Sequence, residues 1–194
     1  MSKQSFFAIK RTLIAALLYF ACLGIGVLLN LIFDRNGNMF YAPAFSAVFS
    51  GILYFQYLLK KPFFGLISLT SVIVSLFFLF SGHFWATILP YWGFALLADL
   101  LAKSGHYKED IKNKLSFILF SLTTTGPIFF MWLAPKAYQE MLLERGKDMA
   151  YITKVMVEPD LKVVLFFFGL TLLGALLGII LGQRIPCNKS SKKF

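Results

Sequence analysis

Residues Leu161–Leu181 read LKVVLFFFGLTLLGALLGIIL, an apolar run whose one charged residue, Lys162, lies near its start. A helix needs about 20 such residues to cross the hydrocarbon core of a bilayer. An open strand or an irregular segment cannot replace the helix there, because lipid leaves exposed backbone N–H and C=O groups without partners. The run therefore predicts a transmembrane helix.

Five further apolar runs precede this one, at roughly 12–33, 42–59, 63–80, 84–102 and 115–133. The chain is 58% hydrophobic, contains 23 phenylalanines and has a mean hydropathy of +0.73. A soluble domain could not hide that much apolar surface. We therefore expect an all-α integral membrane protein, with six transmembrane helices in a single membrane domain, 1–194, and no soluble catalytic module.

The connectors divide the basic residues unequally. Thirteen of the 19 lysines and arginines fall at the two ends of the chain and in the connectors around 60–61 and 103–114, and six fall in 34–41 and 134–162. Cytoplasmic loops carry the excess of Lys and Arg. Both termini are therefore expected on the cytoplasmic side of a bacterial cell membrane. The basic residues that orient the spans account for the net charge of +10, so nucleic-acid binding is not expected.

The longest polar interval, Ala134–Asp160, is a predicted outer loop between the fifth and sixth spans. Its apolar residues recur every three or four positions, which is typical of an amphipathic helix, and Gly146 is expected to interrupt it. One interpretation is a helix lying on the bilayer surface. The other is a lid over a cavity that opens outward, and the lid residues then expected to face a substrate are Tyr138, Met141, Arg145 and Met149.

Pro90 and Pro127 each lie about six residues from the outer end of a predicted span, about 9 Å deep at about 1.5 Å per residue. Proline has no backbone N–H and leaves one carbonyl of the preceding turn without its hydrogen bond. Inside the bilayer, such unpaired backbone groups occur only where protein or water can hydrogen-bond to them. Two breaks at one depth favour a shared cavity, although each could be satisfied locally. The candidate substrate-binding residues near it are Arg35, His83, Trp85, Tyr91, Trp92, Thr124, Met131 and Trp132; an interfacial aromatic belt is the other explanation for the Trp and Tyr residues.

His83 is the candidate metal ligand, because its imidazole could coordinate a transition metal or a haem iron. A structural role is the alternative, and His106 is expected on the opposite side of the membrane. Asp99 is the one acidic residue inside a predicted span, one turn before Lys103, with which it could pair. The chain has no Walker loop, HExxH or GxSxG motif. Neither an enzyme nor an intrinsic cofactor is therefore expected.

Two rows of small residues have the spacing that lets membrane helices approach closely. Gly174, Gly178 and Gly182 follow one another at four-residue intervals in the last span, where we expect packing within the chain. The other row begins the first span and could dock another membrane subunit: Ala8, Thr12 and Ala16.

Together, the six spans, the internal termini, this first-span row and the long last outer loop resemble the S component of an energy-coupling-factor (ECF) transporter. NMFYAPAFSAVFSGILYFQYLL at 38–59 and SGHFWATILPYWGFALLADLLA at 81–102 resemble its MptD-type branch. The family's docking row carries alanines, and here Thr12 departs from that pattern. The resemblance implies a membrane subunit that captures a small molecule outside the cell. It would associate with a transmembrane coupling subunit and two cytoplasmic ATPases that drive uptake.

The resemblance implies a vitamin or a metal ion as cargo or, in members similar to this branch, haem. Aromatic side chains could hold the haem ring, and His83 or a methionine could bind the iron. Arg35, Arg145 or Lys147 could pair with the propionates, arginine being suited to bidentate carboxylate binding. A vitamin-like molecule would use the same aromatic residues without His83. A membrane assembly or structural protein is the alternative from another class, and it predicts no cavity between Pro90 and Pro127.

Overall fold

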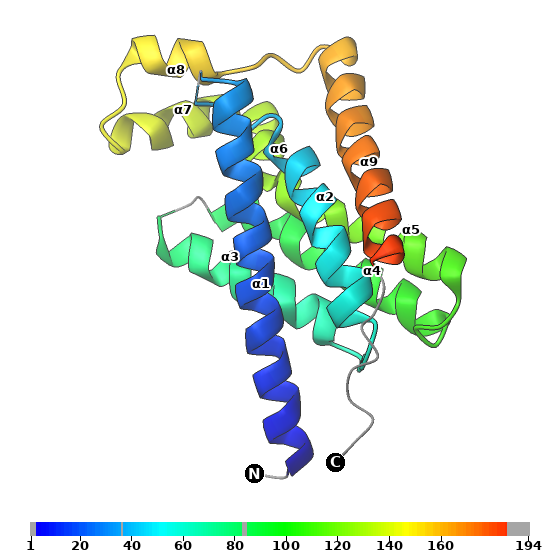
Figure 1. The fold of residues 1–194 in the computed structure, drawn as a ribbon. Helices are drawn as coiled ribbons and strands as arrows, with labels where there is room; N and C mark the ends of the chain where they lie inside the picture. The colour runs from blue at the N-terminus through cyan, green and yellow to red at the C-terminus, as the bar shows by residue number, and fades with distance from the viewer. Residues whose placement is uncertain (1–2, 36, 83–84, 186–194) are drawn as a thin grey trace.

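The computed structural model describes residues 3–35, 37–82 and 85–185, so the predicted ligand His83 lies outside the described residues. Every regular element in these ranges is helical, which confirms the all-α class (Figure 1). The α-helices are α1 (Lys3–Phe33), α2 (Ala42–Leu53), α3 (Leu66–Phe80), α4 (Ile88–Ser104), α5 (Asp110–Ser121), α6 (Gly126–Leu133), α7 (Pro135–Glu144), α8 (Met149–Val155) and α9 (Leu161–Arg184). Three short segments are the π-helix η1 (Tyr54–Leu58) and the 3-10 turns η2 (Trp85–Thr87) and η3 (Leu122–Thr125).

Four helical stretches in the described ranges are long and apolar enough to cross a membrane: Lys3–Phe33, Trp85–Ser104, Asp110–Leu133 and Leu161–Arg184. The stretches Ala42–Leu58 and Leu66–Phe80 are apolar but shorter. The 15 residues of α3 rise only about 22 Å, whereas the hydrocarbon core is about 30 Å thick. The chain is thus a multi-pass membrane protein, and the number of six spans stays a prediction.

The helices extend beyond the predicted spans at their charged ends. Helix α1 begins at Lys3 and includes Lys10 and Arg11, although its span was expected to begin near 12. Helix α5 begins at Asp110 instead of near 115. Hydropathy marks only the part of a helix that suits lipid, whereas Lys and Arg are good helix formers in water. The 31 residues of α1 therefore form a helix about 46 Å long.

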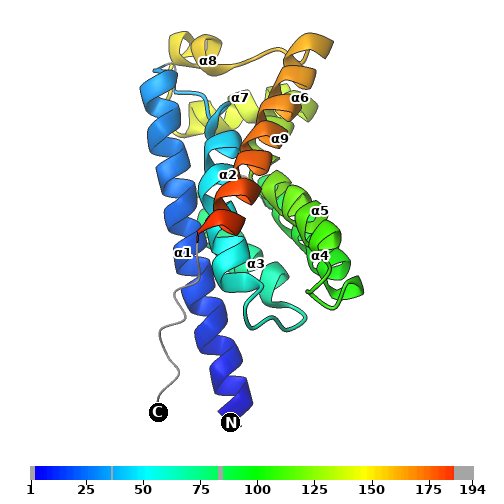
Figure 2. The same ribbon diagram turned by 45° about the vertical axis from the view of Figure 1, so that its right-hand side comes forward.

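Helix α2 packs between α1 and α9, as Figures 1 and 2 show. The contact with α9 depends on glycine. A Cβ added at Gly174 or Gly178 would clash with the backbone carbonyl oxygen of Ala44 or Ala47, respectively, and one at Gly182 would lie 2.5 Å from the carbonyl oxygen of Gly51. The glycine row of α9 therefore serves packing within the chain, as predicted.

Helices α7 and α8 lie across the end of the molecule opposite to the start of α1 (Figures 1 and 2). Gly146, with φ of 73°, turns the chain between them, so the predicted interruption is confirmed. Leu142, Ile152 and Val155 form a small core between the two helices. The predicted outer loop is thus a helical hairpin with its own packing, and we call residues Pro135–Val155 the lid.

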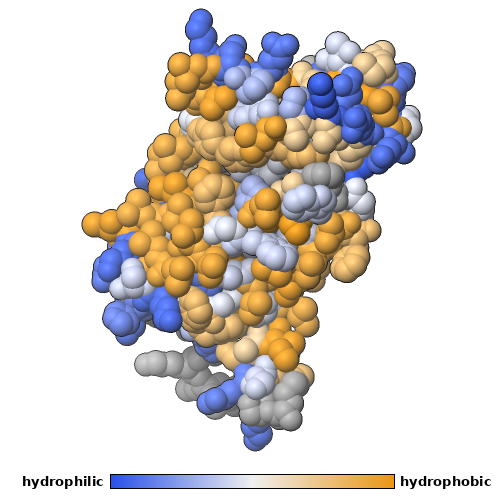
Figure 3. All heavy atoms as spheres, turned by 180° about the vertical axis from the view of Figure 1, so that it is seen from behind, coloured by the Kyte–Doolittle hydropathy of each residue, from blue (hydrophilic) through white to orange (hydrophobic). Residues whose placement is uncertain are grey.

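The flank of the molecule is hydrophobic in its middle and hydrophilic at its two ends (Figure 3). On α1 the outward side chains include Leu13, Leu17 and Leu28, and Leu17 is 69% exposed. Such exposure fits a lipid environment, because acyl chains solvate leucine as readily as a protein core does. The polar ends match the two water-facing sides that the charged connectors predict.

Candidate functional site

A cavity of about 250 Å³ lies between the later turns of α1 and α3 and the first turns of α2, α4 and α6. Its lining carries four hydroxyl groups, and no described lining residue is charged. The hydroxyls belong to Ser46, Thr87, Tyr91 and Thr124, and the apolar lining is Leu23, Val27, Met39, Ala42, Pro43, Phe78, Ile88, Pro127 and Ile128. A concave, mostly apolar site with a few polar groups is the usual form of a small-molecule pocket.

The two 3-10 turns form one wall of this cavity. Pro90 lies in the first turn of α4, after η2, and Pro127 is the second residue of α6, after η3. Both prolines thus lie where a 3-10 turn passes into an α-helix, inside the continuous helical stretches Trp85–Ser104 and Asp110–Leu133, so each marks a local break in the α-helical pattern of its stretch. The two breaks do meet, because a Cβ on Gly126 would clash with the carbonyl oxygen of Thr87.

The three consecutive threonines differ in how firmly their hydroxyls are held. Each donates to the carbonyl oxygen three residues earlier, at 2.7 Å for Thr123, 3.3 Å for Thr124 and 2.6 Å for Thr125. Thr123 also lies 2.5 Å from the phenol oxygen of Tyr19. Thr124 has the longest bond and lines the cavity, so its hydroxyl is the one best placed to turn toward a ligand.

Asn30 holds the loop that covers the cavity. Its side chain is fully buried; it donates to the Asn38 carbonyl at 2.7 Å and accepts from the Tyr41 N–H at 2.9 Å. Asn38 in turn accepts from the Phe40 N–H at 3.0 Å. Met39, inside this clamped loop, lines the cavity. The sequence signal for Asn30 is one amide among apolar residues near the end of a membrane helix, where a polar group needs an internal partner.

The lid rests on the loops on both sides of the cavity. A Cβ on Gly37 would lie 3.0 Å from the Tyr151 phenol oxygen, and one on Gly82 would lie 3.8 Å from an Arg145 nitrogen. The lid therefore approaches the loop before α2 and the turn after α3. Both glycines have positive φ, 89° and 83°, a conformation that favours glycine.

A family model described as hypothetical bacterial integral membrane protein (Trep_Strep) matches residues 9–189. The chain belongs to this family. The match reaches from α1 to beyond α9, and it agrees with the apolar helices in assigning the chain to the membrane. Comparisons with curated proteins and with solved structures gave no match.

In this Trep_Strep member, two of the predicted site residues that the structure describes line the cavity, Tyr91 and Thr124. Met131 and Trp132 line a second pocket of about 430 Å³ beneath the lid, where Trp132 Nε1 donates to the Val157 carbonyl at 3.0 Å. Trp85 lines a third space of about 660 Å³, an apolar groove between α4 and α6 that also includes Pro90. The two prolines therefore face different spaces.

The remaining predicted residues of the helix ends lie elsewhere. Trp92 is 44% exposed and donates to the Ser75 hydroxyl at 2.9 Å. Arg35 is exposed after the end of α1. Neither residue lines the cavity. Hydropathy does not show which way a side chain points, so the sequence could not exclude these two residues from the site.

The four lid residues expected to face a substrate do not line the cavity either. Tyr138 packs on Phe130 with ring centres 5.7 Å apart, and burial raises the pKa of its phenol. Met141 packs against the lid core. Arg145 and Met149 are exposed. The apolar face of the lid is therefore occupied mostly by the lid's own packing.

The predicted docking row on α1 faces the interior of the chain. Thr12 is 5% exposed and Ala16 4% exposed, and the Thr12 hydroxyl donates to the Ala8 carbonyl at 2.9 Å. Ala8 is half-buried. Docking through this row stays a prediction, and it would require these buried side chains to become accessible.

Asp99 does not pair with Lys103, contrary to expectation. The carboxylate is fully buried and accepts from the Gly65 N–H at 2.9 Å, the Ser68 N–H at 3.1 Å and the Tyr107 phenol at 2.9 Å. Lys103 lies over the ring of Phe64, 4.1 Å from its centre. A carboxylate at a helix N-terminus is favourable, so Asp99 anchors the start of α3 from the neighbouring helix.

The described residues contain no group of three or more His, Cys, Asp or Glu side chains that could hold a metal ion. The cavity itself offers hydroxyls and the Met39 thioether. This arrangement can hold a small molecule by apolar contact and a few hydrogen bonds.

Proposed function

We infer that the chain is the substrate-capture subunit, or S component, of an ATP-driven ECF-type importer in a bacterial cell membrane. The observation that carries this proposal is the cavity of about 250 Å³ beneath the loop held by Asn30. The lid beside this loop contacts the loops on both sides. A covered pocket near one end of a membrane bundle is suited to capture from that side.

The lining favours a small, uncharged and largely apolar molecule, such as a vitamin-like compound. At about 250 Å³, the cavity is slightly smaller than the about 300–1,000 Å³ typical of ligand pockets. No described lining side chain could neutralise an ionised ligand, and a buried charge without a partner is strongly unfavourable. Ser46, Thr87, Tyr91 and Thr124 would supply the hydrogen bonds.

Haem is the second candidate cargo. Met39 and Tyr91 line the cavity, and a thioether and a phenolate are both known ligands of haem iron. The propionates would then have to reach Arg35 or Arg145 at the outer end. Adding haemin to the purified protein is expected to give a Soret band if haem is the cargo, and Met39→Ala and His83→Ala test the two iron ligands.

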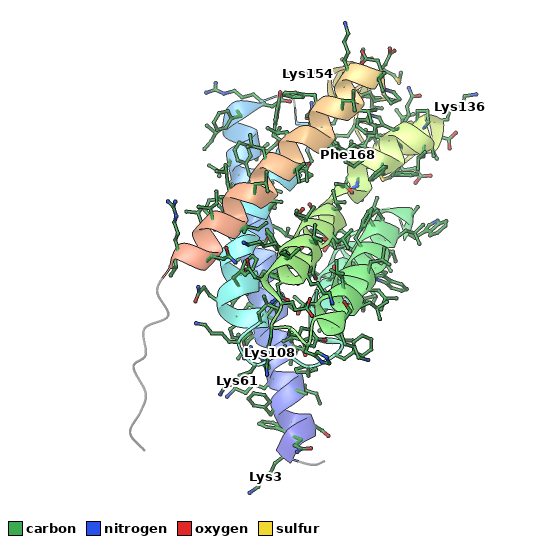
Figure 4. All side chains as sticks on the ribbon, turned by 90° about the vertical axis from the view of Figure 1, so that its right-hand side faces the viewer. Lys3, Lys61, Lys108, Lys136, Lys154 and Phe168 are labelled. Carbon is green, nitrogen blue, oxygen red and sulfur yellow. The ribbon has the colours of Figure 1, made fainter. Side chains whose placement is uncertain are left out.

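Energy for uptake would come from partners. We propose a transmembrane coupling subunit and two cytoplasmic ATPases, with both termini of this chain on the ATPase side. Figure 4 shows Lys3, Lys61 and Lys108 toward one end of the molecule and Lys136 and Lys154 at the other, which supports the charge-based orientation. The chain itself would not be an enzyme.

The deciding experiment is mass spectrometry of whatever co-purifies with the protein. A retained small molecule, together with co-purified membrane and ATPase subunits, is the expected result. Uptake by this chain alone, without ATPases, would contradict the proposal. The alternative of an assembly or structural protein predicts no cavity between Pro90 and Pro127. Because the two prolines line different spaces, a retained ligand, and not the cavity beside Pro127, distinguishes capture from this alternative.

A further inference from the structure

A groove of about 550 Å³ opens at the end of the molecule opposite to the lid. One wall is the start of α1 and carries Lys3, Gln4 and Phe7; the other is the connector between η1 and α3 and carries Lys61 and Phe63. Each wall thus combines a positive charge with an aromatic ring. The proposed substrate cavity shares no lining residue with this groove.

Among the described residues, no carboxylate neutralises the positive charge of the groove. Lys3 and Lys61 are exposed, and neither is in an ion pair with a carboxylate of the described residues. The first 98 residues contain one acidic residue, Asp34, just beyond the other end of α1. At 1.5 Å per residue, Asp34 is about 46 Å from Lys3. The groove therefore suits an anion supplied from outside the chain.

The apolar residues around the groove indicate which class of anion fits it. Phe7 and Phe63 line the groove, and the adjoining surface of α1 exposes Phe6, Ile9 and Leu13. A free phosphate ion would use only the lysines. A phospholipid would use both parts, because its phosphate meets the lysines while its acyl chains follow the apolar face of α1. Basic pockets between membrane helices are suited to such headgroups.

We propose that this groove is a binding site for an anionic phospholipid, with Lys3 and Lys61 holding the headgroup phosphate from the two walls. The lipid joins the start of α1 to the connector before α3. Gln4 can donate a further hydrogen bond to a headgroup oxygen. The lipid site shares no lining residue with the substrate cavity. The identity of the substrate therefore does not affect lipid binding at this site.

The test reconstitutes the full chain in nanodiscs of equal parts phosphatidylglycerol and phosphatidylcholine and measures the lipids retained after delipidation by native mass spectrometry. Wild type is expected to retain phosphatidylglycerol preferentially. Lys3→Gln/Lys61→Gln should lower the retained ratio about thirtyfold. The matched control, Lys136→Gln/Lys154→Gln, removes two exposed lysines at the opposite end (Figure 4) and should leave the ratio unchanged.

Two results would overturn the proposal. One is equal retention by the wild type and both double variants. The other is complete displacement of phosphatidylglycerol by millimolar glycerol phosphate, which would identify a site for a free phosphate. Loss of a co-purifying membrane subunit from Lys3→Gln/Lys61→Gln, with lipid retention intact, would assign the groove to an acidic protein partner and contradict the lipid.

Discussion

Single polar side chains determine how the cavity is built. Asn30 is buried within an apolar helix and fastens the loop above the cavity through two backbone hydrogen bonds. Thr124 presents a hydroxyl whose local bond, at 3.3 Å, is the weakest of the three neighbouring threonines. In an apolar setting such groups are strongly held only where their partners are well placed. The weak bond at Thr124 is therefore the one a ligand can replace.

Thr124→Val is expected to weaken ligand retention about fivefold, because one hydrogen bond contributes about 1 kcal/mol. The size of the side chain is kept, so the fold should be unchanged. The measurement is the amount of co-purified ligand per mole of protein, by mass spectrometry. Thr153→Val is the control, since Thr153 also bonds a backbone carbonyl but lies exposed on α8. Equal loss in both variants would remove Thr124 from the site.

Asp99→Ala is expected to destabilise the chain by about 3 kcal/mol, because it leaves two N–H groups at the start of α3 and the Tyr107 phenol without their buried acceptor. Asp99→Asn keeps one acceptor oxygen and should lose less. Thermal unfolding in detergent would measure both. A stability of Asp99→Ala equal to that of the wild type would show that water replaces the carboxylate.

At the level of elements, close backbone approach at glycine and short non-α segments bring the helices together around a core of buried side chains that includes Tyr19, Tyr54 and Phe120. Helices α2 and α9 meet along glycine. The turns η2 and η3 bring the starts of α4 and α6 together at Gly126. Because lipid gives little hydrophobic drive for helix association, tight van der Waals packing must hold such pairs. A larger side chain at one of these glycines should therefore destabilise the fold.

Gly178→Ala is expected to destabilise the chain by about 1–3 kcal/mol, since its Cβ would clash with the backbone of α2 at Ala47. Gly169→Ala, on the same helix, has open space around the added Cβ. It should stabilise the chain by about 0.5–1 kcal/mol through the higher helix propensity of alanine. Thermal unfolding of both variants tests the contrast, and the opposite order would contradict the close contact between α2 and α9.

Trp132→Phe is expected to loosen the lid, because it removes the 3.0 Å hydrogen bond to the Val157 carbonyl that ties α6 to the connector after the lid. Hydrogen exchange of the residues around Val157 should become faster. Trp92→Phe is the control, since it removes the bond to Ser75 at an exposed position away from the lid. Unchanged exchange in Trp132→Phe would mean that the lid is held by other contacts.

At the level of the whole molecule, charge and hydropathy divide the chain into an apolar middle and two polar ends (Figure 3). The end with the lid carries Lys136 and Lys154, and the other carries Lys3 (Figure 4). The excess of basic residues at that second end predicts that it faces the cytoplasm. Capture would then take place outside, and coupling to the ATPases inside.

This orientation is tested by cysteine labelling after Cys22 and Cys187 are replaced by alanine. A membrane-impermeant maleimide added to intact cells is expected to label Lys136→Cys and not Lys108→Cys. Both should react once the cells are permeabilised, because both positions are exposed. The reverse pattern in intact cells would place the lid in the cytoplasm and contradict capture from outside.

Local sequence was sufficient for the helices. Each predicted span contains a helix over most of its described residues, and the lid divides at Gly146, because hydropathy and helix-breaking residues act over a few neighbouring positions. Boundaries at Lys3 and Asp110 were missed, since the chain stays helical after it leaves lipid. The glycine row of α9 was interpreted correctly because its four-residue spacing describes a single helix face.

The site required the tertiary structure. Tyr91 and Thr124 reach the cavity, whereas Trp92, Trp132 and the four lid residues do not. Depth in the membrane follows from position along one helix, but the direction of a side chain depends on which helices surround it. The cavity also depends on a glycine that admits a neighbour, as Gly26 does for Ser46. The sequence by itself thus determined which segments form apolar helices, because hydropathy is a local property, and only the packing of five helices decided which of their side chains meet.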